Sequence, residues 1–305
     1  MKLVTIFAKP GKAAGRTVAL ILCFCAAGWP QDLHKIVAVS RFENKTSYGY
    51  EIGDGMADQL AHALIQSAQF VVVERQTLLD ITAEQDWAAS GKMNSSESAQ
   101  IGKLTSAQVH IKGTITEFES RSTSSDSGIS VRGIRVGGKR EEAHVGIILR
   151  LIDTTSGHVL LSERVEKNAT SAGMDVSGSR RGVDFGSQSF IKTPLGKATQ
   201  LAIDQSVGII ISRLKQIPFR CSVVKAEGDE VIISAGEKTG VKSGDLFDIF
   251  AKGEELTDPV TGESLGGEET KIGKVQIHQV AEKFAKAKVL NSGQQIQRGY
   301  IARHE

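Results

Sequence analysis

The chain has 305 residues, with 37 basic and 35 acidic side chains and a formal net charge of +2. A nearly neutral chain gives no electrostatic basis for binding nucleic acid, so we exclude that class of function. Aromatic residues make up only 5% of the chain while glycine occurs 32 times, a composition typical of β-rich, turn-rich structure. The length is sufficient for two domains.

The N-terminus predicts export. An apolar run from Val18 to Ala27 follows four basic residues and is followed by small residues up to Gly28. This order describes a secretory signal peptide over residues 1–28. The apolar run is shorter than the about 20 residues that a membrane-spanning helix needs, so we do not interpret it as one. Removal of the signal peptide would take away four basic residues and no acid, which changes the formal charge from +2 to −2. The four basic residues are Lys2, Lys9, Lys12 and Arg16.

Cys23 and Cys25 lie inside the apolar run. A bacterial lipoprotein signal has a small residue directly before the lipidated cysteine, whereas Leu22 and Phe24 occupy these positions. Both cysteines are therefore weak candidates for lipidation. Once the signal is removed only Cys221 remains, and a lone cysteine forms no internal disulfide.

Residues 29–218 alternate strand and helix patterns. The continuous apolar run Ile36–Val39 predicts a strand buried on both faces. A helix with one apolar face follows, and Asp54 is its candidate N-cap. Phe70–Val73 predicts a second strand, and a helix pattern begins at Thr77.

The pattern continues to the end of this domain. We expect a short helix over 94–102 from a capping box, a strand over 109–118, and a hairpin of strands 147–152 and 159–165. A long helix begins at Pro194, because proline is favoured in the first turn. The sum predicts an α/β sandwich in which helices pack on a mixed sheet.

Residues 219–305 have a different pattern. Short β-like runs are separated by glycine-rich turns, which predicts a small β-barrel of five or six strands.

Gly262–Gly266 matches the GxSxG pattern of serine hydrolases. That motif needs a buried strand before it and a helix after it, whereas turn residues flank it here, so we do not assign Ser264 a catalytic role. The seven histidines form no metal-binding motif, and the sequence predicts no cofactor or metal.

Two polar segments, 119–145 and 166–192, fit neither pattern. Structureless loops of this length are uncommon in compact domains and are usually functional or disordered. Each segment is also long enough for two transmembrane β-strands of about 10 residues and a turn. Their partial apolar alternation favours membrane hairpins, while their polarity and lack of Tyr and Trp favour flexible loops. Both interpretations stay open from the residues alone.

The placed elements resemble the curli secretion channel family (CsgG/HfaB) over residues 34–217. The resemblance is a distributed pattern: the first strand with Phe42, the helix start Gly55–Leu60, the stretch Phe70–Gln76, and Leu151–Gly157. Residues 219–305 resemble the C-terminal domain of flagellar assembly protein T. Gly236, Gly240, Gly244 and Phe247 are among the positions that carry this second resemblance.

The channel family implies an exported, non-enzymatic outer-membrane protein facing the periplasm, whose subunits form a homo-oligomeric ring. Each subunit would donate two β-hairpins to a shared transmembrane β-barrel, and 119–145 and 166–192 lie where the family places them. A hairpin with open edges is viable in lipid only if neighbours close the barrel. The implied partner is a secreted polypeptide client or another envelope assembly protein.

In that family the loop after the first strand narrows the pore. The corresponding residues here are Asn44, Tyr48 and Tyr50, which are our pore-constriction candidates. The alternative is that the tyrosines pack on the neighbouring helix or subunit. A competing function is a soluble or peripheral periplasmic scaffold of a cell-envelope or flagellar assembly, for which the polar segments would be loops.

Overall fold

The computed structural model describes residues 33–49, 51–75, 77–90, 105–124, 129–131, 134–136, 138–174, 185, 188–260, 262 and 264–304. The predicted signal peptide with Cys23 and Cys25, Tyr50, and the predicted helix over 94–102 lie outside these residues.

The first part of the described chain contains eight strands and four helices. The helices are α1 (Ile52–Gln66), α2 (Leu78–Ala89), α3 (Gln188–Ile191) and α4 (Pro194–Lys215). The strands are β1 (Lys35–Val39), β2 (Glu43–Asn44), β3 (Phe70–Val73), β4 (Val109–Ser124), β5 (Ile129–Val131), β6 (Ile134–Val136), β7 (Gly138–Asp153) and β8 (Val159–Met174).

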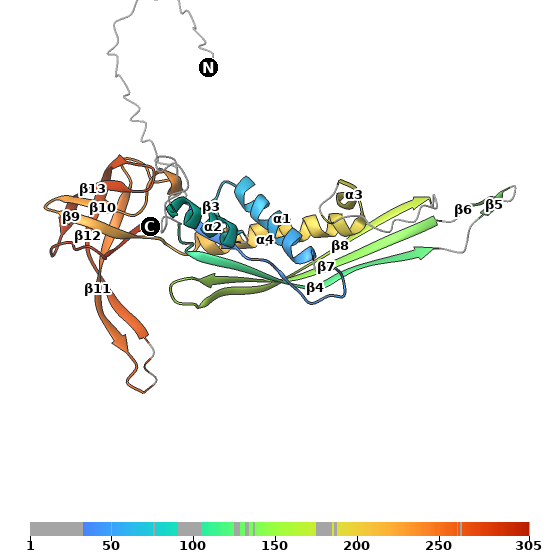
Figure 1. Cartoon of the computed structure of the whole chain (residues 1–305), viewed down its shortest axis with the longest axis horizontal. Coiled ribbons are helices and arrows are strands. Elements are labelled where there is room, and N and C mark those ends of the chain that lie inside the picture. The colour runs from blue at the N-terminus through green and yellow to red at the C-terminus, as the bar shows by residue number, and fades with distance from the viewer. Residues whose placement is uncertain are drawn as a thin grey trace, which may run out of the picture. The chain divides into compact units, whose positions relative to one another are not determined.

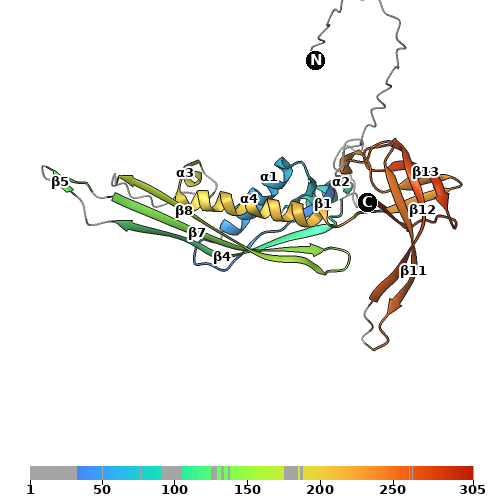
Figure 2. The ribbon, with the colours of Figure 1, turned by 180° about the vertical axis from the view of Figure 1, so that it is seen from behind.

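Five strands form one mixed sheet in the order β3-β1-β4-β7-β8, and the short β2 pairs with β4. The pairs β1–β3 and β1–β4 are parallel, whereas β4–β7 and β7–β8 are antiparallel. Helices α1 and α4 lie side by side on one face of this sheet (Figures 1 and 2). The predicted helix-on-sheet sandwich is thus confirmed.

The core lies between the sheet and these two helices. Leu60 and Leu64 of α1, and Ile203 and Ile210 of α4, are at most 1% exposed and pack against alternate residues of β4 and β7, such as Leu149. Burying a leucine or isoleucine side chain contributes about 1.5–3 kcal/mol. The apolar stripes that predict the helices therefore also hold them on the sheet.

Helix α1 begins earlier than the sequence indicates, so the prediction of Asp54 as its N-cap was wrong. The helix starts at Ile52, which is buried with Gly53 against the core. Asp54 instead lies in the first turn, where its carboxylate forms an ion pair with Arg41 Nε at a distance of 2.9 Å. An acidic side chain at that position also interacts favourably with the helix dipole.

Strands β4, β7 and β8 continue beyond the part of the sheet that forms the core, as Figure 1 shows. After one register shift between Ile115 and Glu117, the pairing continues without a further shift out to Ser124, Lys139 and Gly173. We call the part of these strands in residues 119–124, 138–145 and 166–174 the extension. It includes much of the two polar segments, whereas the end of the second segment forms the short helix α3.

The C-terminal part is a closed barrel of six strands in the order β10-β13-β12-β11-β14-β9, which confirms the predicted small barrel. Phe247, Ile249 and Val275 are fully buried inside it. Ser264 begins a strand of the β11–β12 hairpin rather than lying between a strand and a helix. The elements are β9 (Phe219–Glu227), β10 (Glu230–Ile233), the 3₁₀ helix η1 (Glu237–Thr239), β11 (Leu246–Thr257), β12 (Ser264–Val280), β13 (Ala285–Ser292) and β14 (Ile301–His304).

Candidate functional site

The first candidate residue, Asn44, braces the loop that follows β2. Its Nδ2 donates hydrogen bonds to the backbone oxygens of Tyr48 at 2.9 Å and Gly49 at 3.3 Å. Its Oδ1 accepts from the backbone nitrogen of Thr46 at 2.9 Å and from the Thr46 hydroxyl at 2.8 Å. One side chain thus fixes both ends of a short turn, an arrangement that asparagine favours. The structure gives Asn44 the role of setting the position of Tyr48.

The Tyr48 ring packs edge-to-face on Phe118 of β4, with ring centroids 4.8 Å apart and an interplanar angle of 75°. Such a pair stabilises by about 0.5–1.5 kcal/mol beyond its buried area. Tyr48 is nevertheless 45% exposed, while Phe118 is 3% exposed. Tyr48 therefore lies anchored on one side and open on the other, at the level where the extension leaves the core.

Two further phenylalanines complete an aromatic cluster around Phe118. Phe190 of α3 stacks on Phe118 at 6.4 Å between centroids, and Phe185 lies 4.8 Å from Phe190 and 6.1 Å from Phe118. Gly55 of α1 makes room for this cluster, because a Cβ there would lie 2.3 Å from a Phe185 ring carbon. The cluster joins the Tyr48 loop, β4, α1 and α3 at the base of the extension.

Sequence reasoning did not find this cluster. Phe118 ends a predicted strand, and Phe185 and Phe190 lie in a segment that is otherwise polar. The available signal was their rarity: aromatic residues are only 5% of the chain, and two of them fall within six residues of a serine- and glycine-rich stretch. Their convergence on Tyr48 depends on tertiary packing, which spacing along the chain does not reveal.

On the sheet face away from α4, a charged network lies at the same level. Glu117 accepts from Arg164 Nη2 at 2.6 Å, and its other oxygen accepts from the Thr116 hydroxyl at 2.8 Å. The pairing register between β4 and β7 shifts at this point, as in a β-bulge. Gly146 lies beneath the carboxylate, where a Cβ would be 1.7 Å from Glu117 Oε2. Bulges bend strands and increase their twist. The charged network therefore lies at an irregularity of the β4–β7 pairing at the base of the extension.

Apart from Val145 and Ala143, which are buried with the core, the extension is polar on both faces. On the side shared with α4, the register places Ser120 opposite Ala143 and Ser122 opposite Glu141. On the other side, Glu119 lies opposite His144, and Arg121 opposite Glu142. A strand that faces lipid carries apolar residues at alternate positions. The described strands of the extension have no such stripe.

The described residues show no group of His, Cys, Asp or Glu side chains that could hold a metal ion. Among the described helices, none has the length and apolarity needed to cross a membrane. Cys221 is buried in the barrel, and this burial raises the pKa of its thiol to about 12. The thiol is therefore inert near neutral pH.

Two family models match the chain. The model described as curli production assembly/transport component CsgG matches residues 26–227. The model described as flagellar assembly protein T, C-terminal domain, matches residues 228–302. Both resemblances drawn from the sequence are thereby confirmed. No curated protein matches the chain.

Several solved structures resemble this chain at low identity. The hypothetical protein CT253 from Chlamydia trachomatis is 14% identical over 59% of this chain and 98% of its own, with a TM-score of 0.37. A PelC dodecamer from Paraburkholderia phytofirmans is 18% identical over 57% and 86%, with a TM-score of 0.28. Lipoprotein GNA1162 from Neisseria meningitidis is 13% identical over 57% and 99%, also with a TM-score of 0.28. Similarities at these TM-scores carry no argument about function.

Proposed function

The chain belongs to the curli production assembly/transport component CsgG family, and from this premise we propose that it is a subunit of an oligomeric secretion channel. The channel sits in the outer membrane, faces the periplasm and exports a polypeptide or a component of a surface fibre. It performs no catalysis, and the client passes by diffusion through the ring. Residues 1–28 act as the export signal, 29–218 form the channel domain, and 219–305 form a separate barrel domain.

The main support for this proposal is the extension, whose two open edges belong to different strands, β4 and β8. Within the described chain, β4 beyond Phe118 and β8 along its length have no strand on their outer sides. Backbone groups on an open edge pair readily with another chain. Pairing of the β4 edge of one copy with the β8 edge of the next is a head-to-tail contact, and such contacts close into rings when the rotation permits.

The extension also has a suitable length. Its described strands have six residues in β4, eight in β7 and nine in β8, which at about 3.3 Å per residue reach about 20 to 30 Å from the core. The hydrocarbon layer of a bilayer is about 30 Å thick. The segments 119–145 and 166–192 would supply the hairpins of the shared barrel. At the hairpin tip, Ile129 pairs with Val136, and Val131 with Ile134, so aliphatic residues share the paired positions.

Tyr48 is the pore-constriction residue in this proposal, with Asn44 as the residue that positions it and Tyr50 as its neighbour on the same loop. Support comes from the base of the extension, where Tyr48 is fixed on Phe118 but remains 45% exposed. A ring of subunits would bring one copy of this side chain from each subunit to the same height. A circle of tyrosine side chains at this height would narrow the passage.

Conductance in planar lipid bilayers tests the channel and its constriction together. The purified oligomer is expected to give discrete steps, and Tyr48→Ala is expected to enlarge each step because it removes a side chain from the narrowest level. Tyr300→Ala is the matched control, since Tyr300 is partly buried in the barrel core, and it should leave the steps unchanged. Absence of any conductance would contradict the channel, whereas steps unaffected by Tyr48→Ala would contradict only the constriction.

A second function is favoured by one specific observation, the polarity of both faces of the extension. A periplasmic scaffold, soluble or peripheral to the membrane, would use the same ring contacts in water. It predicts that trypsin cleaves at Arg121, Arg140 or Lys167 as readily in lipid as in solution. Protection of these sites only in lipid or detergent would exclude the scaffold.

A further inference from the structure

Helix α2 presents a tryptophan to solvent. Trp87 is 66% exposed, although tryptophan is highly buried on average in folded proteins. Among the described elements, none packs extensively on α2, and of the side chains of this helix that the structure describes Gln85 is buried. Trp87 shares one helical face with Asp80 and Glu84, which precede it by seven and three residues. This face is aromatic and acidic, since α2 has three carboxylates and no basic residue.

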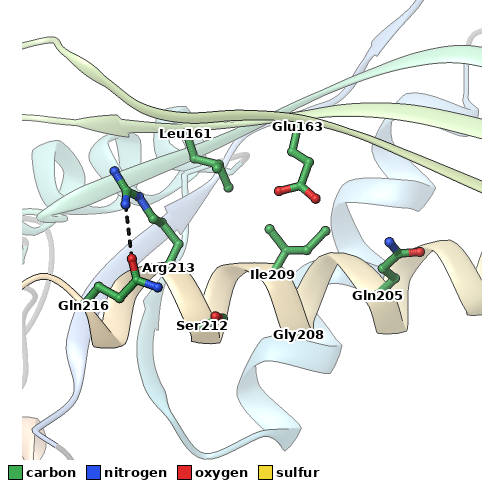
Figure 3. Close-up of a pocket in the computed structure, with 8 residues that line it drawn as sticks. All are labelled: Leu161, Glu163, Gln205, Gly208, Ile209, Ser212, Arg213 and Gln216. Carbon is green, nitrogen blue, oxygen red and sulfur yellow. Dashed lines mark hydrogen bonds between the residues drawn. The ribbon is translucent and has the colours of Figure 1, made fainter.

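A groove lies at the opposite edge of the sheet, between β8 and α4. Its volume is about 540 Å³. Leu161 and Glu163 point from β8 toward α4, and Ile209 points from α4 toward the strand, as Figure 3 shows. The remaining lining residues come from α4 and its C-cap and are Gln205, Gly208, Ser212, Arg213 and Gln216.

The groove is open and has a basic end. No atom lies within 4 Å of the position that a Cβ of Gly208 would occupy, so the space above this residue is empty in the isolated chain. Arg213 is held across the end of the groove, where its Nε donates to the Leu160 backbone oxygen at 3.1 Å and its Nη1 to Gln216 Oε1 at 3.2 Å. Arg213 and Lys215 form the basic last turn of α4.

We propose that Trp87 of one subunit docks in the α4–β8 groove of the next subunit, a contact that rests on the ring proposed above. The sheet order supports this pairing, because α2 follows β3 at one edge of the sheet and the groove borders β8 at the other. A head-to-tail contact brings opposite edges together. The indole would contact Leu161 and Ile209, two apolar side chains that are partly buried next to the core.

The polar chemistry of the two surfaces is complementary as well. The indole N–H is a donor without acceptor capacity, and Glu163 supplies a carboxylate in the groove. The Arg213 guanidinium can stack on an aromatic face, which contributes about 0.5–2 kcal/mol. Asp80 and Glu84 would approach the basic end of α4. A large aromatic side chain in a fitted pocket is the usual form of an interface hot spot.

A crosslinking experiment tests the contact on the full chain in its own membranes. One chain carries Ala83→Cys, an exposed position of α2 one turn before Trp87, and a second carries Ser212→Cys in the groove; the two are co-expressed so that this mixture assembles into mixed rings, and the membranes are treated with a short bismaleimide. The buried Cys221 thiol does not react near neutral pH because its pKa is raised to about 12. We expect a covalent dimer from the mixture and none from either variant alone. Because each protein has only one engineered cysteine, an intramolecular crosslink cannot give this result.

Two surface variants provide an independent measurement. Gly208→Arg fills the groove with a side chain that the free subunit tolerates, and Trp87→Ala removes the docking residue. Each is expected to reduce the yield of oligomer at least tenfold in size-exclusion chromatography. Gln200→Arg on the same helix, outside the groove, and Phe284→Ala, an exposed aromatic of the barrel, are the matched controls and should assemble normally.

The outcomes separate this contact from the ring itself. Intact rings in which Trp87→Ala and Gly208→Arg assemble normally, without a crosslinked dimer, would overturn the Trp87 contact and leave the channel proposal standing. Complete absence of oligomers in the unsubstituted protein would overturn both. A crosslinked dimer together with two assembly-defective variants would support the contact.

Discussion

At the scale of single residues, His110 makes the stability of the folded protein depend on pH. Its Nε2 contacts the Ser40 hydroxyl, and burial, together with the nearby positive charges of Arg75 and Lys112, lowers the pKa of His110 below its ordinary value of 6.5. The imidazole of His110 therefore binds a proton less readily in the folded protein than in the unfolded chain. Stability that is fully present above pH 6.5 is lost as the pH falls through the lower pKa of the folded state.

The lowered pKa of His110 predicts how His110→Gln changes the pH dependence of stability. The variant is expected to lose less unfolding free energy than the parent protein between pH 7 and pH 5. Urea denaturation at a series of pH values, followed by circular dichroism, measures the difference. His62→Gln, at an exposed position of α1, is the control and should retain the pH slope of the parent. An unchanged slope in His110→Gln would contradict the assigned cause.

Gly53 and Gly49 form a matched pair on either side of the start of α1. A Cβ on Gly53 would lie 2.4 Å from the Phe42 backbone oxygen, whereas nothing lies within 4 Å of one on Gly49. Overpacking of this kind costs about 1–3 kcal/mol. Gly53→Ala should therefore lower the urea midpoint, and Gly49→Ala should leave it nearly unchanged. Equal midpoints for the two variants would show that the helix start shifts without cost.

At the scale of elements, the strands and helices of the core follow from hydrophobic pattern. Ile36–Val39 and Phe70–Val73 are apolar runs of strand length, and α4 has an apolar stripe behind a proline. The extension was harder to predict because its residues are polar on both faces, so that hydrophobic period gives no signal there. Its strands are held by pairing with neighbours, which a single segment does not encode.

Trp87 illustrates the same limit within one helix. The sequence places it among the apolar residues of α2, which favours burial, yet the structure leaves it 66% exposed. The Tyr48 cluster is the opposite case, since Phe118 is distant in sequence from Phe185 and Phe190 and meets them only through packing. Local pattern predicted α2 and the start of β4, but neither α3 nor which side chains meet.

Helix α4 offers a prediction at the element scale. Thr193 is its N-cap: the hydroxyl oxygen accepts from the Gly196 backbone N–H at 3.0 Å. Replacing such a cap by alanine costs about 1 kcal/mol, so Thr193→Ala should lower the thermal midpoint. Thr193→Ser keeps the hydroxyl and should retain most of the stability. Similar losses for both variants would mean that the threonine methyl, rather than the hydrogen bond, stabilises the helix start.

At the scale of the whole molecule, strands extend from an α/β domain with unpaired outer edges within the described chain. The family match gives the class of function, assembly and transport, and the barrel adds a domain similar to the C-terminal domain of flagellar assembly protein T. A single copy leaves the β8 edge, the α4–β8 groove and Trp87 without partners within the described chain. These features share one explanation if copies of the chain assemble head-to-tail.

The most direct test is negative-stain imaging of the full-length protein extracted in mild detergent from its own membranes. We expect closed rings with a central opening in the membrane fraction. A monomeric protein found only in the soluble periplasmic fraction would contradict the channel and leave the scaffold as the function of this chain.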